Sequence, residues 1–202
     1  MFVQVIQAQV TDPQALRQRW DAWEKELKAG AEGYLGGTGG IAEDGTFILS
    51  ARFESEGAAR KNSERPEQGE WWQETERSLE GPVFYDCKEV DEWKGGGSDT
   101  AGFVQVIQGY VNEKDQLRAD MKKMSEMPDN RDDVIGGIVA WGPNDGFSQF
   151  VYFTSEEQAR AGEAASSDEE WPPEAKEIWE RWQANTRDVK YIDLKEPWFS
   201  AP

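Results

Sequence analysis

The strongest constraint on this chain is an internal duplication. The segment Phe2–Gln7 recurs without change as Phe103–Gln108, and Gly36-Gly37 recurs as Gly136-Gly137 at nearly the same spacing. A six-residue identity inside one chain is rare by chance, so a repeat takes priority over any short motif. We interpret the chain as two copies of one structural unit.

A glycine-rich stretch between the copies predicts the domain boundary. Residues 95–101 begin with three glycines and continue with small and polar residues that bury little apolar surface. We therefore expect a first repeat over 1–94, a linker over 95–101 and a second repeat over 102–202.

The first half of each repeat predicts a strand followed by a helix. Residues 2–10 are rich in β-branched and aromatic residues, as strands are. Thr11–Pro13 has the form of a helix start, with a capping side chain before proline. Leu16, Trp20, Trp23 and Leu27 then follow at spacings typical of one helix face.

The second half predicts two strands, a helix and a last strand. The two strands, over 34–42 and 46–53, flank the hairpin turn Asp44-Gly45. A helix follows from Ser55 and is broken at Pro66, and residues 82–90 form the last strand. The glycines of residues 36–40 lack the lysine of a phosphate loop and indicate a bulge or a close approach of two backbones.

The order strand-helix-strand-strand-helix-strand is that of the ferredoxin-like split βαβ unit, which makes the fold class α+β. Two helices cover only one face of such a sheet, yet the first strand has apolar residues of both parities. We therefore predict that the two repeats pack sheet to sheet as a pseudo-dimer within the chain.

Composition excludes several kinds of chemistry. The chain has no histidine, so Ser-His-Asp sites, histidine-ligated zinc and histidine-ligated haem are excluded, and its single cysteine cannot form an internal disulfide. A net charge of −18 opposes nucleic acids and anionic membranes as partners. We expect no metal and no cofactor.

Nothing in the sequence predicts a membrane segment. No apolar run approaches the roughly 20 residues that a membrane helix requires. The first residues carry neither a basic region nor a signal-peptide core. We expect a cytoplasmic protein.

The segment Phe53–Trp72 resembles the second-helix region of antibiotic-biosynthesis-monooxygenase (ABM) domains. It has an aromatic strand end, a helix starting at Ser55, a break at Pro66 and then an aromatic helix. With the duplication, the chain resembles a tandem fusion within the dimeric α/β barrel superfamily. This resemblance implies an intrachain dimeric α/β barrel with a pocket between sheet and helices in each unit.

The resemblance also implies a chemistry and a set of residues. Cofactor-independent members oxygenate electron-rich aromatic compounds, while haem-degrading members use a histidine that this chain lacks. The implied catalytic residues are Asn62 and Arg65, which would stabilise an oxyanion. The implied substrate-binding residues are Gln7, Trp20 and Trp72.

Each candidate also has a purely structural explanation. Trp20 lies on a helical stripe that favours the core, and Trp72 recurs as Trp179 in the repeat. Gln7 could bond a ligand, bond its counterpart in the other repeat or lie at an exposed edge. Asn62 and Arg65 precede Pro66, where a local capping role is common.

The two repeats differ at the candidate site. The stretch 164–173, which corresponds to the region of Asn62 and Arg65, contains neither asparagine nor arginine. We therefore place the candidate site in the first repeat.

The leading hypothesis is an ABM-like cofactor-independent monooxygenase acting on a phenolic or quinol small molecule. The alternatives are a non-catalytic small-molecule-binding or stress-associated module and a scaffold for a protein partner. Because the fusion supplies both halves of the pseudo-dimer, a monomer is expected.

Overall fold

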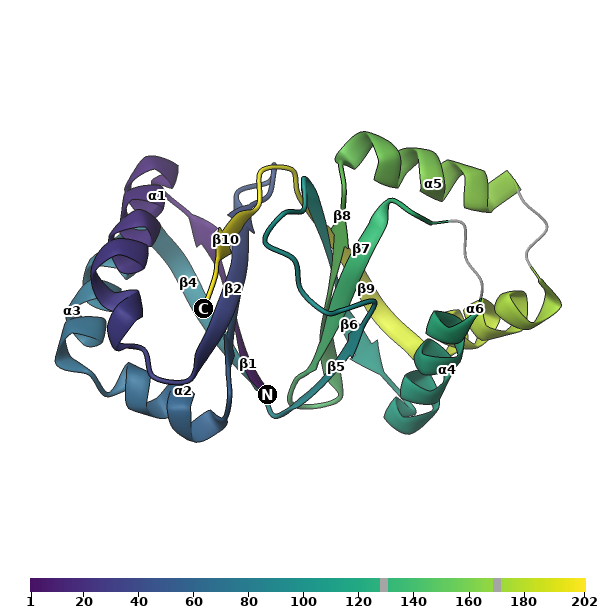
Figure 1. The fold of residues 1–202 in the computed structure, drawn as a ribbon, viewed down its shortest axis with the longest axis horizontal. Helices are drawn as coiled ribbons and strands as arrows, with labels where there is room; N and C mark the ends of the chain where they lie inside the picture. The colour runs from purple at the N-terminus through teal and green to yellow at the C-terminus, as the bar shows by residue number, and fades with distance from the viewer. Residues whose placement is uncertain (128–130, 169–171) are drawn as a thin grey trace. The chain divides into compact units, whose positions relative to one another are not determined.

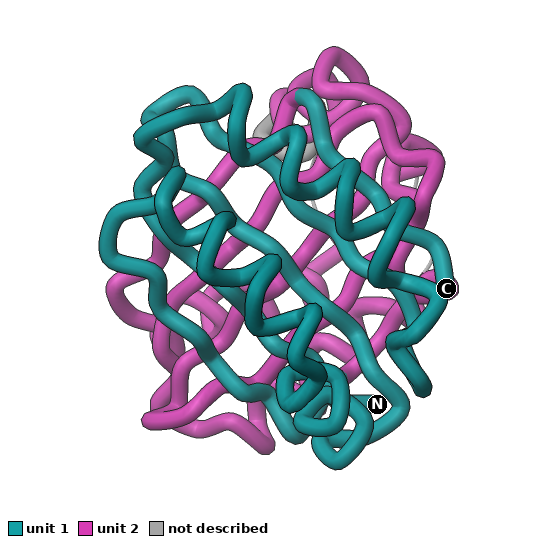
Figure 2. Tube along the Cα trace, turned by 90° about the vertical axis from the view of Figure 1, so that its left-hand side faces the viewer, with its two compact units in different colours: residues 1–90, 196–202 teal, residues 91–195 magenta. Residues whose placement is uncertain are grey.

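The computed structural model describes residues 1–127, 131–168 and 172–202. Residues 169–171, part of the stretch compared with Asn62 and Arg65, lie outside the described residues. The chain divides into two compact units, one of residues 1–90 with 196–202 and one of residues 91–195 (Figure 2).

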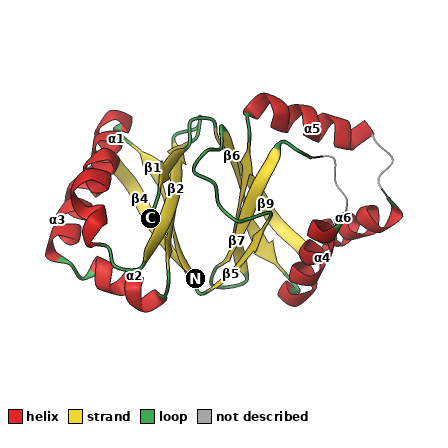
Figure 3. Ribbon diagram, in the orientation of Figure 1, coloured by secondary structure: helices red, strands yellow, loops and turns green. Residues whose placement is uncertain are grey.

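The first unit contains a five-stranded antiparallel sheet with helices on one face (Figures 1 and 3). Its strands follow the order β10-β2-β3-β1-β4. Its elements are β1 (Phe2–Val10), α1 (Pro13–Ala22), β2 (Tyr34–Ile41), β3 (Thr46–Phe53), α2 (Glu56–Ser63), α3 (Pro66–Thr75), β4 (Leu79–Cys87) and β10 (Trp198–Ser200).

The second unit repeats this plan with the strand order β5-β7-β8-β6-β9. Its helices also lie on one face of their sheet (Figure 3). Its elements are β5 (Glu89–Trp93), β6 (Phe103–Val111), α4 (Lys114–Glu126), β7 (Val134–Trp141), β8 (Gly146–Phe153), α5 (Glu156–Asp168), α6 (Pro173–Asn185) and β9 (Thr186–Leu194). The predicted α+β class and ferredoxin-like order are confirmed. Packing of the two sheets face to face stays a prediction.

Local sequence signals start the helices where they were predicted. The Asp12 carboxylate accepts a hydrogen bond from the Ala15 amide at 2.9 Å, and the Ser55 hydroxyl accepts one from the Ala58 amide at 3.1 Å. Pro66 begins α3 and so separates it from α2. These caps satisfy backbone donors that a helix start leaves unpaired.

The predicted stripe of the first helix is buried, but the helix changes its winding. Leu16, Trp20, Trp23 and Leu27 are each at most 9% exposed. The α-helical winding ends at Ala22, and Trp23–Leu27 forms a π-helical turn. Such wider turns often occur near functional sites.

The C-terminal residues contribute an edge strand to the first sheet. The sequence predicts that they belong to the second repeat, yet Trp198 pairs with Gly39, and Ser200 pairs with Gly37. The glycines of β2 permit this, since a Cβ at Gly36 would lie 2.8 Å from the Ser200 carbonyl oxygen. Gly36 also has a φ of 113° beside a register shift, so both a bulge and a close backbone approach occur here.

Trp198, on this added strand, packs against the core of the first unit. Its ring centroid lies 5.7 Å from that of Trp20 and 6.2 Å from that of Phe47. The Arg17 guanidinium lies over the same ring at 4.9 Å. The edge strand β10 therefore extends the aromatic core beyond β2, on the face of the sheet that the helices cover.

None of the helices in the described part of the chain has the length and apolar character needed to cross a bilayer.

We predict that Trp198→Ala destabilises the protein by about 2–3 kcal/mol, because a half-buried indole loses its contacts with Trp20 and Phe47. Urea denaturation followed by circular dichroism would measure this change. An unchanged unfolding midpoint would show that the last strand contributes nothing to the core.

Candidate functional site

A cavity of about 340 Å³ lies in the first unit, between the sheet and the helices. Fifteen residues from β1, α1 with its π-helical turn, β2, β3, α2, α3 and β4 surround it. They are Gln4, Ile6, Trp20, Trp23, Tyr34, Leu49, Ala51, Phe53, Asn62, Ser63, Gln68, Gly69, Trp71, Trp72 and Phe84.

The two-residue period of the strands decides which side chains reach the cavity. Gln4 and Ile6 of β1 line it, as do alternate residues of β3 from Leu49 to Phe53. Gln7 has the opposite parity and therefore projects from the other face of the sheet. The structure thus places Gln4, rather than the predicted Gln7, at the cavity.

Four tryptophans form the helix side of the cavity, and two of them are fixed by hydrogen bonds between helical segments. The Trp23 indole N–H donates to Gln68 Oε1 at 2.9 Å. The Trp71 indole N–H donates to the Arg19 carbonyl oxygen at 2.8 Å. These bonds tie the first helical segment to α3 and keep the wall rigid.

The predicted residues Trp20 and Trp72 both line the cavity. Trp72 meets Phe84 edge to face, with centroids 5.0 Å apart. Phe84 is 43% exposed although it lines the cavity, so the cavity opens to solvent beside the edge strand β4. Trp20 packs on Trp198 and also serves the core, so its structural and pocket-wall roles coexist.

Asn62 is the best-defined polar group of the cavity. It is 7% exposed and lines the cavity, and its Oδ1 accepts a hydrogen bond from Arg65 Nη1 at 2.8 Å. Because arginine only donates, this contact fixes the oxygen of the amide toward Arg65. The group left to meet a cavity occupant is the Nδ2 donor.

Arg65 lies behind Asn62 and is not among the described residues that line the cavity. Its Nη1 and Nη2 both donate to the Leu27 carbonyl oxygen at 3.1 Å, and its Nε donates to Glu67 at 3.0 Å. A Cβ at Gly30 would overlap this guanidinium. Arg65 therefore connects the α2–α3 junction to the end of the first helical segment and orients Asn62.

The cavity wall is neutral. The lining contains amides, hydroxyls and indoles but no Asp, Glu, Lys or Arg side chain among the described residues. In the described part of the chain, no three His, Cys, Asp or Glu side chains could hold a metal ion. Such a cavity suits an uncharged aromatic molecule with one or two polar groups.

Sequence reasoning missed Gln4, Tyr34, Gln68 and Trp71. The alternation that places Ile6 on the helix side would also have selected Gln4 over Gln7. Gln68 lies one helical turn before Trp72, and Trp71 directly precedes Trp72 in the same aromatic helix. Tyr34 gave no periodic signal because it precedes the glycine run of β2.

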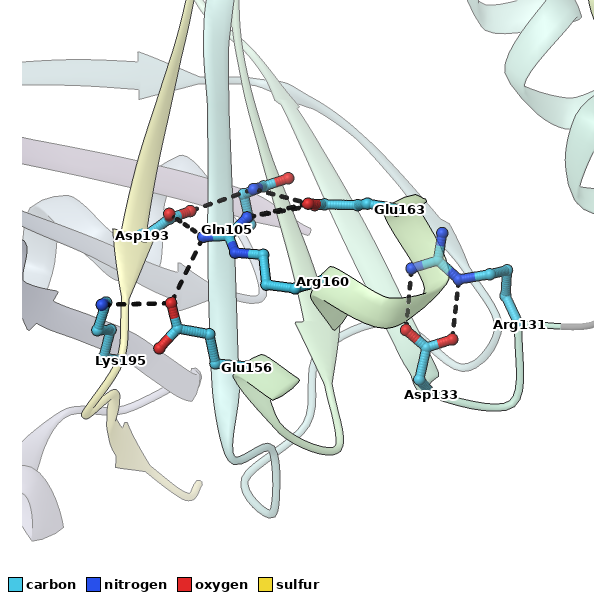
Figure 4. A network of polar contacts seen from close by, with 8 residues as sticks. All are labelled: Gln105, Arg131, Asp133, Glu156, Arg160, Glu163, Asp193 and Lys195. Carbon is cyan, nitrogen blue, oxygen red and sulfur yellow. Dashed lines mark hydrogen bonds and ion pairs between the residues drawn. The ribbon is translucent and has the colours of Figure 1, made fainter. Parts of the chain in front are cut away.

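The matching place in the second unit contains a charged network (Figure 4). Gln105, the counterpart of Gln4, donates to Glu163 at 3.4 Å and to Asp193 at 3.1 Å. Arg160 pairs with both of these carboxylates. Since Glu163 stands where the first unit has Ser63, the two units present different chemistry on the same framework.

The comparisons with known proteins identify a fold. No family model and no curated protein matches the sequence. A candidate monooxygenase from Fusobacterium nucleatum matches with a TM-score of 0.71 at 10% identity, over 96% of this chain and 90% of that one. An anthrone oxidase-like protein matches with a TM-score of 0.61 at 10% identity, over 98% and 89%. A ferredoxin-fold protein related to antibiotic biosynthesis monooxygenases, from Listeria monocytogenes, matches with a TM-score of 0.51 at 10% identity, over 100% and 95%.

The chain has an ABM-like fold. These similarities extend over nearly the whole chain. At this level of identity the comparison concerns the backbone, and the chemistry must be argued from the cavity itself.

The lone thiol contributes no nucleophile to this ABM-like unit. Cys87 is 1% exposed, and burial together with the neighbouring Asp86 raises its pKa to about 12. A thiol reacts as its thiolate, so the side chain is inert near neutral pH.

We predict that Arg65→Ala lowers the free energy of unfolding by about 2 kcal/mol, because the Leu27 carbonyl and Asn62 lose their donors. Denaturant titration would measure it. Arg60→Ala is the matched control, because the Arg60 side chain is 75% exposed and its 3.9 Å ion pair should contribute less than about 0.5 kcal/mol. Equal effects of the two variants would contradict the structural role of Arg65.

We predict that Cys87 does not react with a soluble disulfide reagent in the native protein at pH 8 and reacts fully in denaturant. Because the folded pKa lies above the unfolded value, burial of the neutral thiol favours folding below about pH 9. That contribution declines as the pH rises toward 12. Rapid native labelling would contradict the burial of the thiol.

Proposed function

We propose that the first unit binds a neutral, planar phenolic molecule of the anthrone type and oxygenates it without a cofactor. The observation that carries this proposal is the aromatic cavity of about 340 Å³, with the Nδ2 donor of Asn62 at its wall. The likeness in fold to proteins described as a candidate monooxygenase and as anthrone oxidase-like supports it.

In the proposed reaction the substrate supplies the electrons. Loss of a proton from the substrate places negative charge on its oxygen, and the Asn62 amide stabilises this oxyanion. Molecular oxygen then attacks the activated CH₂ carbon. One oxygen atom enters the new carbonyl, and the other leaves as water with the two hydrogens of that carbon.

The neutral wall determines how the proton leaves. Since no carboxylate or amine of the described residues lines the cavity, we propose that water at the Phe84 opening accepts the proton. The rate should then rise with pH up to the ionisation of the bound substrate itself. Arg65 acts in this scheme as a positioning residue, because its guanidinium holds Oδ1 of Asn62.

A non-catalytic binding module is the second candidate. The observation that favours it is the same neutral lining, which offers no side chain able to act as a general base. This candidate predicts saturable quenching of tryptophan fluorescence by phenols, with no oxygen uptake above the buffer rate.

We also propose that the protein acts as a cytoplasmic monomer. One chain supplies both ABM-like units, and its net charge of −18 favours a dispersed state.

We predict that Asn62→Asp lowers the rate of oxygen uptake with an anthrone-type phenol about 100-fold, because a carboxylate keeps the acceptor for Arg65 but loses the Nδ2 donor. An oxygen electrode and circular dichroism would measure rate and fold. Ser63→Ala, at a neighbouring lining residue, is the matched control and should keep most of the rate. Uptake by Asn62→Asp at the wild-type rate would exclude the oxyanion role, and no uptake by the wild type would favour the binding module.

A further inference from the structure

Each unit contains a corresponding hydrophobic cluster, and the cluster of the second unit includes a tryptophan that the first cluster lacks. In the first unit, Tyr34, Ala51 and Phe53 of this cluster line the cavity. Their counterparts in the second unit are Val134, Val151 and Phe153. The second cluster also includes Trp93, which belongs to the strand that precedes the second repeat.

The indole of Trp93 lies on Gly137 of β7. A Cβ at that glycine would overlap the ring. Gly137 pairs with Val151, just as Gly37 pairs with the cavity-lining Ala51 in the first unit. By register, Trp93 therefore stands over the part of the second sheet that corresponds to a wall of the first cavity.

The residues around the matching glycines explain why the ring fits only in the second unit. In the first unit the Tyr34 hydroxyl lies over Gly37, and the added strand places the small Ser200 opposite that glycine. In the second unit residue 134 is valine, and its side chain is too short to cover Gly137. The indole of Trp93 lies over Gly137, where the first unit has only the Tyr34 hydroxyl at the edge of the cavity.

Local structure on both sides holds Trp93 in register. The Gly96 amide donates to the Trp93 carbonyl oxygen at 3.0 Å, and Lys94 and Gly95 have φ of 48° and 92°, as a type I′ turn requires. Two residues before Trp93, the Asp91 carboxylate accepts hydrogen bonds from Trp141 Nε1 at 2.7 Å and from Arg118 at 2.6 Å. The residues just before the expected linker, which the sequence places in the first repeat, are thus anchored in the second unit.

The ring is held by its shape and not by polar contact. Trp93 Nε1 is buried and has no hydrogen-bond partner among the described residues. A buried indole N–H usually has a partner, and leaving it unpaired costs free energy. An aromatic group retained in this way interacts with its surroundings as a bound aromatic molecule would.

We propose that the second unit contains a latent site for a neutral aromatic ligand of indole size and that Trp93 occupies it as an internal ligand. The chain then presents one open site, in the first unit, although it contains two equivalent frameworks. This proposal concerns binding alone and stands whether or not the first unit oxygenates its ligand.

The test is calorimetric titration of the full-length chain with indole. For the wild type we expect at most one indole per chain, and this binding should be lost in Ala51→Phe, which fills the first cavity. Trp93→Ala should bind one additional indole, and the double variant Ala51→Phe/Trp93→Ala should retain that additional indole. The melting temperature of Trp93→Ala should fall by several degrees and recover with saturating indole.

Trp179→Ala is the matched control in the same unit, because Trp179 is 39% exposed and its removal leaves no enclosed space. It should not change the number of indoles bound. If Trp93→Ala does not fold, Trp93→Leu with benzene as the probe replaces it, with one additional benzene expected. A folded Trp93→Ala or Trp93→Leu chain that binds no more probe than the wild type would overturn the proposal.

Discussion

Addition of a strand to the glycine-bearing edge of each sheet is the constraint on which this structure depends. Glycines in β2 and β7 leave the backbone bare enough for another strand or turn to approach. The added strand then determines which side chain covers the β2 or β7 edge of the sheet. On the first sheet it brings Trp198 onto Trp20, a residue of the cavity wall, and on the second it brings Trp93 onto Gly137, the counterpart of Gly37.

A second shared device is an arginine that joins the first-helix region of each unit to the helix after the hairpin. In the first unit Arg65 leaves the α2–α3 junction and packs on Gly30. In the second unit Arg131 leaves the loop before β7 and packs on Gly162, while Asp133 holds its guanidinium at 2.8 and 2.9 Å. Arg65 reaches from the helices after the hairpin to the first-helix region, whereas Arg131 reaches in the opposite direction. The glycine that makes room for the guanidinium therefore lies in the first-helix region of one unit and in the later helix of the other. Gly162 stands where the first unit has Asn62, and this exchange removes the amide from the second unit.

Much of the fold was predictable because its signals are local. The duplication, the Asp12 and Ser55 caps and the break at Pro66 indicate the order of elements without reference to packing. The destination of the last strand was not predictable, because pairing of Trp198 with Gly39 depends on residues far apart in sequence. The change to π-helical winding at Trp23 likewise left no mark on the spacing of the apolar stripe.

The candidate site was predictable in part. The resemblance implied Trp20, Trp72 and Asn62, all of which line the cavity. Gln7 was selected without regard to the strand alternation that turns it away. Arg65 was assigned to charge stabilisation, yet its donors are directed at the backbone of a neighbouring segment, which only the tertiary structure reveals.

The position of β10 has a consequence for biosynthesis. Residues 198–200 form an edge of the first sheet, so a ribosome must complete the whole second repeat before the first sheet gains its fifth strand. Until then, the glycine-bearing edge of β2 carries unpaired backbone groups, and Trp20 lacks its neighbouring ring. The N-terminal unit therefore matures last, although it is translated first.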